Sequence, residues 1–282
     1  MDIQTLGIIG AGQMGNGIAQ VCATAGIKIV MCDINATAVQ RGIDTVSANL
    51  DRLIKKDKLP ATEKEPILAR IQGTTDLNAL TQSDFIVEAA TENLELKRNI
   101  LKDVDGLAKP GTIIATNTSS ISITKLASTM SRPQQFVGMH FFNPVPVMAL
   151  VEVIRGIQTS DETYAATDAL ARRIGKTPIA VKNSPGFVVN RILVPMINEA
   201  VFTLQEGLAK TEEIDSGMQL GANHPIGPLA LADLIGLDVC LAVMEVLYRE
   251  FNDPKYRPAP MLREMVDAGY LGRKTKRGFY TY

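Results

Sequence analysis

The chain has 282 residues, of which 46% are apolar and 21% are charged, a composition typical of a globular protein with a sizeable core. Its 29 basic and 30 acidic residues leave a net charge of −1, which excludes a general attraction to nucleic acid or to anionic membranes. Cys22, Cys32 and Cys240 are scattered and odd in number, so they favour neither a disulfide framework nor a metal site. The apolar start lacks a basic leader, and no apolar run approaches the ~20 residues of a membrane-spanning helix. We therefore expect a cytoplasmic protein without metal, nucleic-acid or membrane partners.

Short apolar runs alternate with helical stretches over residues 1–183. Helices are expected between the strands, such as Gly15–Ala25 and Asn35–Lys56, and the charged stretch KKDKLPATEKEP predicts a helical arm that projects from the sheet. This order predicts an α/β domain, a Rossmann-type doubly wound and mostly parallel sheet. The expected strands, several of them apolar at consecutive positions as in a sheet buried on both faces, are Thr5–Ile9, Lys28–Cys32, Phe85–Glu88, Ile113–Thr116, Phe136–Met139, Leu150–Ile154 and Ile179–Lys182.

The pattern changes at KNSPGFVVNR, where Pro185 and Gly186 interrupt the chain. Residues 184–282 predict an all-helical C-terminal domain for substrate binding and dimerisation. We expect a homodimer, because two of these helices carry more apolar surface than a layer of four helices can hide. The predicted helices are Arg191–Gln205, Thr211–Leu220, Pro228–Glu250 and Ala259–Ala268, of which the first and third are the strongly apolar ones.

The stretch LGIIGAGQMGNGIAQ contains the spacing G-x-G-x-x-G between an expected strand and an expected helix. Glycines at these positions allow a tight turn, a close approach of the backbone to a pyrophosphate, and close packing of helix and strand. The alternative is an ordinary strand–helix turn, which the context makes the weaker interpretation. We expect the turn to bind the phosphates of a dinucleotide at the helix N-terminus through Gly10, Ala11, Gly12, Gln13, Met14 and Gly15.

Asp33 follows the second expected strand and lies 18 residues after Gly15. A carboxylate at this position accepts hydrogen bonds from the ribose hydroxyls and repels a 2′-phosphate. The alternatives are a helix cap or a solvated aspartate. The spacing favours the first interpretation and therefore predicts NAD rather than NADP as the cofactor.

Polar side chains follow the expected strand in IIATNTSS, and one of only two histidines ends the next strand in GMHFFNPVPVM. Ligands of doubly wound sheets lie at the carboxyl ends of strands, so Ser119 and His140 are candidate site residues. The alternatives are that the hydroxyls cap a helix and that His140 is a core histidine. Glu152, in the apolar run LVEVI, needs a partner if it is buried, and a histidine held by a carboxylate is a common acid–base pair. Glu152 could also be a polar residue on a half-exposed strand face.

Several of these motifs together resemble the L-3-hydroxyacyl-CoA dehydrogenase family, in order and over nearly the whole chain. They are GAGQMGNGIAQ, EAATENLELK, ATNTSSISI, GMHFFNPVPVM, LVEVI and SPGFVVNRILVP, and the terminal LGRKTKRGFY also fits. One departure is Lys276, where the family commonly has glycine. The segment GANHPIGP resembles bacterial members that act on 3-hydroxybutyryl-CoA, and no enoyl-CoA hydratase segment is present, so the resemblance is to a stand-alone enzyme.

The resemblance implies roles for single residues. His140 is the general acid/base, Glu152 holds its imidazole, and Ser119 and Asn190 hydrogen-bond the C3 oxygen of the substrate. Lys56 is a candidate for the CoA phosphates, although Lys55 and Lys58 are hard to tell apart from it. The other positions that the resemblance places along the cofactor, besides Ser119, are Glu92, Lys97, Asn143 and Lys274.

These observations predict an oxidoreductase that interconverts (S)-3-hydroxybutyryl-CoA and acetoacetyl-CoA by hydride transfer with NAD. One alternative is a dehydrogenase of a free hydroxy acid or sugar acid, which would not need a lysine-bearing arm. Another is a cofactor-binding protein without catalysis, like the lens crystallin recruited from this family. The presence of His140, Glu152, Ser119 and Asn190 argues against the second alternative. The direction of the reaction and the range of chain lengths stay open.

Overall fold

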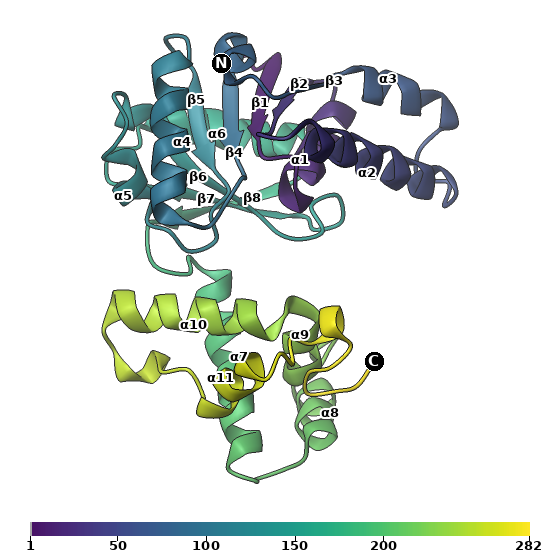
Figure 1. Cartoon of the computed structure of the whole chain (residues 1–282), viewed down its shortest axis with the longest axis vertical. Helices are drawn as coiled ribbons and strands as arrows, with labels where there is room; N and C mark the ends of the chain where they lie inside the picture. Colours follow the sequence, from purple (N-terminus) through teal and green to yellow (C-terminus); the bar gives the residue numbers. More distant parts are fainter. Residues whose placement is uncertain (1) are drawn as a thin grey trace. The chain divides into compact units, whose positions relative to one another are not determined.

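The computed structural model describes residues 2–282 and divides the chain into two compact units, Met1–Asn183 and Ser184–Tyr282. The first unit holds one eight-stranded sheet with the order β3-β2-β1-β4-β5-β6-β7-β8 (Figure 1). All neighbouring strands are parallel except β6 and β7, which are antiparallel. This sheet confirms the predicted Rossmann-type, mostly parallel architecture. The strands are β1 Thr5–Ile9, β2 Lys28–Cys32, β3 Ile71–Thr74, β4 Phe85–Glu88, β5 Ile113–Thr116, β6 Phe136–Phe141, β7 Leu150–Arg155 and β8 Thr177–Lys182.

The predicted strands agree with the structure except at a few boundaries and at one edge. Four of them coincide with β1, β2, β4 and β5, while β6 continues two residues further, to Phe141. The strand β3 was not predicted. It lies at the edge of the sheet, and Gln72 and Gly73 are exposed, so its sequence lacks the apolar run that marks a buried strand.

Helices connect the parallel strands of the first unit. After α2 and a turn, α3 packs back along α2, and the two helices extend away from the sheet together (Figure 1). The Asn35 side chain caps α2 by accepting from the backbone N–H groups of Thr37 and Ala38. The helices are α1 Gln13–Thr24, α2 Ala36–Ile54, α3 Lys64–Ala69, α4 Leu94–Leu107, α5 Ile123–Ala127 and α6 Asp161–Arg173, with 3-10 turns η1 Ala61–Glu63, η2 Leu77–Gln82 and η3 Pro133–Gln135.

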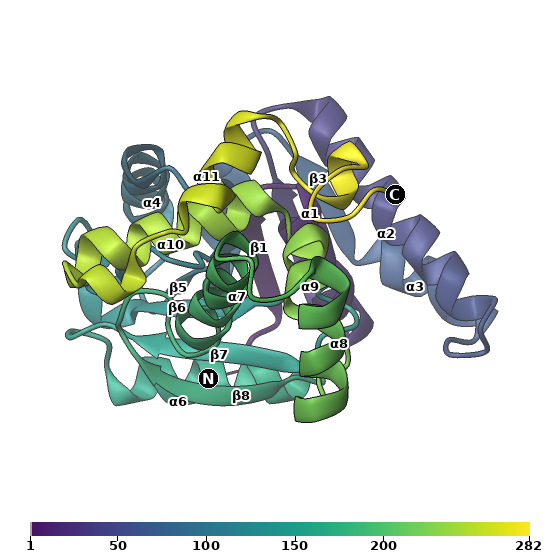
Figure 2. The same ribbon diagram turned by 90° about the horizontal axis from the view of Figure 1, so that it is seen from below.

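The second unit is helical, as predicted, and α7 packs against α9, α10 and α11 (Figure 2). The prediction of one helix over Pro228–Glu250 is wrong, because Gly236 has a φ of 107° and separates two helices there. None of the helices formed by residues 2–282 is long and apolar enough to cross a membrane. The helices are α7 Val189–Gln205, α8 Thr211–Ala222, α9 Pro228–Ile235, α10 Leu237–Phe251 and α11 Pro260–Asp267, with 3-10 turns η4 Pro254–Tyr256 and η5 Arg273–Thr275.

Two buried aspartates fix the C-terminal segment of the second unit. The Asp233 carboxylate accepts from the backbone N–H groups of Phe279 and Tyr280, both at 2.9 Å. Asp215 accepts from the Tyr280 hydroxyl at 2.8 Å, and burial together with this hydrogen bond raises the pKa of the phenol. Lys276, in the same segment, adopts the left-handed conformation with a φ of 58°. A glycine fits this conformation better, so the departure from the family pattern introduces local strain.

Candidate active site

His140 and Glu152 lie directly opposite each other on the antiparallel strands β6 and β7. The Nδ1 atom of His140 lies 2.7 Å from Oε2 of Glu152, and both residues are buried, with exposed fractions of 6% and 0%. The ring of Phe142 packs against the imidazole at a centroid distance of 4.6 Å. A carboxylate at Nδ1 favours the tautomer that carries its proton there, which makes Nε2 the basic nitrogen. The pair therefore has the chemistry of a general acid/base.

The segment after β5 connects Ser119 to two neighbouring strands. The Asn117 side chain accepts from the backbone N–H of Phe141 at 2.9 Å, which ties this segment to the strand of His140. Glu92, in the loop after β4, accepts from the Thr118 hydroxyl at 2.8 Å. It also accepts from the backbone N–H of Ser119 at 2.6 Å and from the Ser119 hydroxyl at 2.7 Å. The structure thus brings Ser119 and Glu92 together and fixes the direction of the serine side chain.

Lys97 lies in the interior of the first unit, with 1% of its surface exposed. Its ammonium contacts the buried carboxylate of Glu88, which also accepts from the Thr116 hydroxyl at 2.8 Å and from the backbone N–H of Ala90 at 2.9 Å. The family resemblance implies that Lys97 lies along the cofactor. The structure places its ammonium on Glu88, where it braces the loops after β4 and β5. Sequence reasoning missed Glu88 and Thr116, although a carboxylate that ends an apolar strand signals a buried partner.

The glycine turn between β1 and α1 has the geometry of a dinucleotide-binding loop. Gly10 has a φ of 98°, and a Cβ atom there would lie 2.7 Å from the carbonyl oxygen of Ala89. The N-cap residue of α1, Gly12, has no side chain that could cap the first N–H groups of the helix, which suits the binding of a phosphate there. Asp33 accepts from the backbone N–H of Ala11 at 2.8 Å, which connects the turn to the end of β2.

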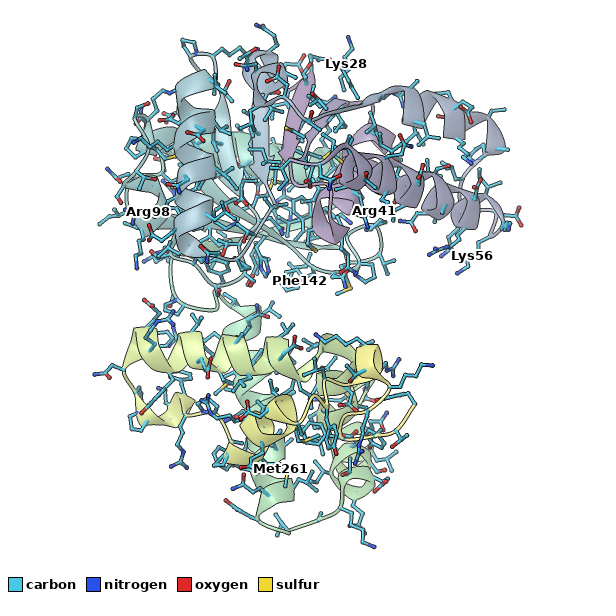
Figure 3. The ribbon with its side chains drawn as sticks, viewed as in Figure 1. Lys28, Arg41, Lys56, Arg98, Phe142 and Met261 are labelled. Atoms are coloured by element: carbon cyan, nitrogen blue, oxygen red, sulfur yellow. The ribbon has the colours of Figure 1, made fainter. Side chains whose placement is uncertain are left out.

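Two cavities lie beside Asp33. One, of about 290 Å³, has apolar walls that include Ile34, Leu77 and Ile100 and suits the flat ring of an adenine. The other, of about 250 Å³, lies between the glycine turn and α2 and includes Arg41 (Figure 3). Burial raises the pKa of the nearby Cys32 thiol to about 11, so this cysteine is not a reactive nucleophile. The residues present therefore fit a dinucleotide.

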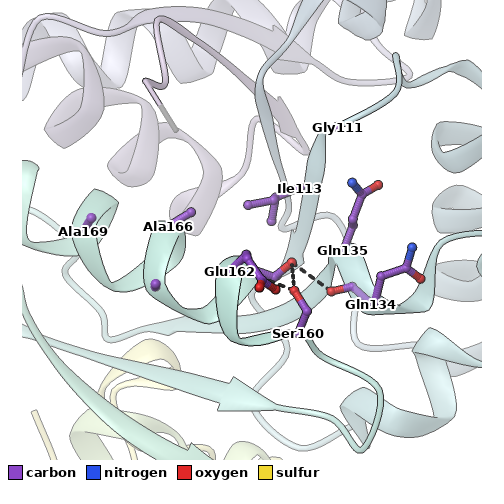
Figure 4. A pocket seen from close by; sticks show the side chains of 10 residues that line it. Gly111, Ile113, Gln134, Gln135, Ser160, Glu162, Ala166 and Ala169 are labelled. Atoms are coloured by element: carbon purple, nitrogen blue, oxygen red, sulfur yellow. Dashed lines mark hydrogen bonds between the residues drawn. The ribbon is translucent and has the colours of Figure 1, made fainter.

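A third cavity of the first unit lies at the opposite edge of the sheet, the one formed by the amino ends of the parallel strands. It has a volume of about 590 Å³ and is lined by Ile113, Gln134, Ser160 and Thr163, near the amino ends of β5 and β6 (Figure 4). None of the predicted site residues lines it. Because ligands of such sheets bind at the carboxyl ends of strands, we assign the site to the edge that carries His140.

The remaining predicted residues lie outside these contacts. Lys56 is exposed in the turn that follows α2, at the end of that helix far from the sheet (Figure 3), and Asn143 is exposed in the loop after β6. Asn190 and Lys274 belong to the second unit, in α7 and η5. The Lys274 ammonium lies 2.6 Å from both carboxylate oxygens of Asp238. Within residues 2–282 no group of three or more His, Cys, Asp or Glu side chains is arranged to hold a metal ion.

Comparison with known proteins identifies the family. Residues 5–184 match the NAD-binding domain of 3-hydroxyacyl-CoA dehydrogenase, and residues 186–282 match its C-terminal domain. The chain is 53% identical to the probable 3-hydroxybutyryl-CoA dehydrogenase of Deinococcus radiodurans over 98% of this chain and 99% of that one, and 50% identical to the Bacillus subtilis protein of the same name over 100% and 98%. The crystal structure of (S)-3-hydroxybutyryl-CoA dehydrogenase PaaH1 from Ralstonia eutropha has a TM-score of 0.97 and 66% identity, covering 100% of this chain and 99% of that one. With its glycine turn and the His140–Glu152 pair, the chain belongs to the 3-hydroxyacyl-CoA dehydrogenase family.

Proposed function

We propose that this protein interconverts (S)-3-hydroxybutyryl-CoA and acetoacetyl-CoA with NAD. The observation that carries the proposal is the contact of 2.7 Å between His140 Nδ1 and Glu152 Oε2 in a buried site. An acid–base pair of this kind suits the oxidation of a secondary alcohol. The names of the relatives with 50–53% identity support the choice of the four-carbon substrate.

In the oxidation direction, Nε2 of His140 accepts the proton of the C3 hydroxyl. NAD, when bound, supplies the acceptor for the hydride that leaves C3. Positive charge develops on the imidazole as the proton arrives, and the adjacent Glu152 carboxylate stabilises that charge. In the reduction direction the imidazolium returns the proton to the C3 oxygen.

Ser119 and Asn190 are proposed to hydrogen-bond the C3 oxygen. Glu92 orients Ser119 through its bonds to the backbone N–H and the hydroxyl, and because the hydroxyl proton points to Glu92, the Ser119 oxygen can accept from the C3 hydroxyl of the alcohol substrate. The role of Asn190 rests on the family resemblance. Asn143 and Lys274 are proposed as cofactor contacts on the same basis.

The CoA moiety is proposed to bind near the arm formed by α2 and α3. Lys55, Lys56 and Lys58 are all exposed at the end of α2, where an ammonium can contact the CoA phosphates. Of these, Lys56 is our candidate, because the family resemblance points to it.

A homodimer through the helical unit is also proposed, in a cytoplasmic setting that suits three free cysteines. Large apolar side chains of this unit are exposed to the extent of 67% for Ile192, 88% for Leu220 and 53% for Leu234. Sedimentation at micromolar concentration tests the proposal, and a monomer under these conditions contradicts it.

The decisive experiment measures NADH oxidation with acetoacetyl-CoA, with longer 3-ketoacyl-CoA substrates and with free acetoacetate. We expect the highest kcat/KM with acetoacetyl-CoA and little turnover of the free acid. Preference for the free acid would favour a hydroxy-acid dehydrogenase. A chain that binds NADH but turns over none of these compounds would favour a protein without catalysis.

A further inference from the structure

Lys176 is a buried lysine that the proposed reaction does not use. It lies between α6 and β8, and 8% of its surface is exposed. Its Nζ atom donates hydrogen bonds to the carbonyl oxygens of Val145 at 2.5 Å and Met148 at 2.8 Å. Among residues 2–282 no carboxylate forms an ion pair with it, and burial lowers the pKa of the ammonium. A buried cation held by main-chain carbonyls alone is costly, and its retention calls for a specific reason.

The two carbonyls belong to the 142–149 loop, which joins the strand of His140 to the strand of Glu152. Within this loop the backbone N–H groups of Val147 and Met148 donate to the Pro144 carbonyl at 2.9 and 3.0 Å. The loop begins with Phe142, whose ring packs against the imidazole of His140. A shift of the loop would therefore move a direct neighbour of the proposed general base.

On its other side the 142–149 loop contacts the helix of the glycine turn. Val145 is 2% exposed, and a Cβ atom on Gly17 of α1 would lie 2.8 Å from the Val145 Cβ atom. Helix α1 begins at Gln13, directly after the glycine turn. Val147, by contrast, is 76% exposed. The inner side of the loop is thus held between α1 and Lys176, and its tip faces outward.

We propose that Lys176 is a positioning residue that fixes the 142–149 loop and, through it, Phe142 and Asn143. An ammonium suits this task because its three N–H groups satisfy two carbonyls that an irregular loop leaves without a backbone partner. Hydrogen bonds from a charged donor are also stronger than neutral ones, so a single side chain can hold the loop. An apolar side chain of equal length would fill the space and leave both carbonyls unpaired.

Lys176→Met removes the donors and keeps the length of the side chain, and Lys176→Arg keeps a charged donor. Lys182→Met is the matched control, because this exposed lysine lies at the other end of β8. The chain contains no tryptophan, so Val147→Trp places a single fluorescent reporter on the loop. We expect Lys176→Met to lower the anisotropy of the introduced tryptophan and to speed hydrogen exchange at the Val147 and Met148 amides by more than about tenfold.

The kinetic arm rests on the proposed dehydrogenase function. Small misplacements near a reacting group can cost about 10²-fold in rate, so we expect Lys176→Met to lower kcat for acetoacetyl-CoA by about 10–100-fold with a smaller change in KM. Lys176→Arg should recover most of the activity and protect the loop amides, and Lys182→Met should match the parent in every measurement.

Three outcomes would overturn the inference. The first is unchanged exchange and anisotropy in Lys176→Met. The second is a lower melting temperature while the folded fraction keeps the parental kcat, which would indicate a purely structural lysine. The third is Lys176→Arg behaving no better than Lys176→Met. If Lys176→Met does not fold, Lys176→Leu, which also lacks a donor, takes its place in the same measurements. The exchange and anisotropy measurements need no substrate. A parent protein that is inactive on acetoacetyl-CoA would therefore contradict the proposed function, whereas these two measurements would still test the role of Lys176.

Discussion

Replacing Glu152 by glutamine tests the proposed acid–base pair most directly. The substitution keeps the size of the side chain and leaves an amide oxygen that can still accept from Nδ1 of His140. It removes the negative charge that lies 2.7 Å from that nitrogen in a site where Glu152 is fully buried. Binding of NAD should hardly change, because Glu152 lies in β7 and is not among the residues proposed to bind the cofactor.

The magnitude of the effect follows from the geometry. Two unit charges whose centres lie roughly 4 Å apart interact by about 4 kcal/mol at an effective dielectric constant of about 20. The interaction is present when the imidazole is charged and absent when it is neutral, so it acts on the transition state. A loss of about 4 kcal/mol corresponds to roughly 10³-fold in rate, within the 10²–10⁴-fold range of general acid–base catalysis.

The assay is the steady-state reduction of NAD with (S)-3-hydroxybutyryl-CoA, the direction in which the imidazole gains its charge, together with the NAD dissociation constant and a melting curve for each variant. Glu162→Gln is the control, because this exposed carboxylate lines the cavity at the opposite edge of the sheet. His140→Ala should be at least as damaging as Glu152→Gln, and the double variant should be far from additive, because the two residues act as one unit. Folded Glu152→Gln protein that turns over at nearly the parental rate would refute the mechanism. A lower melting temperature with full activity of the folded fraction would instead make His140 a structural residue.

Three further predictions concern the cofactor, the arm and the C-terminal segment. The parent enzyme should prefer NAD to NADP, and Asp33→Ser should lower the ratio of kcat/KM with NAD to kcat/KM with NADP, because the repulsion of a 2′-phosphate is lost. A parent enzyme that works better with NADPH than with NADH would contradict the role of Asp33. Lys56→Ala should raise KM for acetoacetyl-CoA and leave kcat nearly intact, whereas Lys28→Ala, at an exposed lysine that begins β2, should do neither. Lys276→Gly should stabilise the helical unit by about 0.5–1 kcal/mol in chemical unfolding, because it relieves the left-handed conformation at a φ of 58°. Ala268→Gly, at a right-handed position of the same unit, should lower stability by about 0.5–1 kcal/mol, and a loss of stability in Lys276→Gly would show that no strain is relieved.

The sequence predicted the buried part of the sheet well because burial on both faces leaves a continuous apolar run. β1 and β4 are examples, since nearly all of their residues are buried. The edge strand β3 has exposed residues and a glycine, so it gives no such signal. The break between α9 and α10 was missed for the opposite reason, because both helices are apolar and only Gly236 separates them.

Site residues whose type implies a particular chemistry could be predicted from the sequence. Contacts between residues that are far apart in the sequence could not. A buried glutamate in LVEVI requires a partner, and this requirement points to His140, whose Nδ1 atom lies 2.7 Å from the carboxylate. Nothing local to Lys97 indicates that its ammonium contacts Glu88, or that Lys176 reaches the carbonyls of Val145 and Met148, which lie about 30 residues earlier in the chain. Such contacts depend on the order of strands in the sheet, which composition and spacing do not specify.

The antiparallel pairing of β6 and β7 explains why the contacts of Glu152 and Lys176 lie at the same edge of the sheet, the one formed by the carboxyl ends of the parallel strands. In a fully parallel sheet, every strand would end at the edge where ligands bind, which is the edge that carries His140. The next strand would then start at the opposite edge. Because β7 runs antiparallel to β6, it starts at the edge where ligands bind, and Glu152 enters the sheet directly opposite His140, where neighbouring strands shield it from water. Because β8 is parallel to β7, with Thr177 paired to Leu150, β8 starts at the same edge and carries Lys176 to the 142–149 loop. The strand direction that gives the histidine its carboxylate thus also delivers the lysine that holds the loop between them.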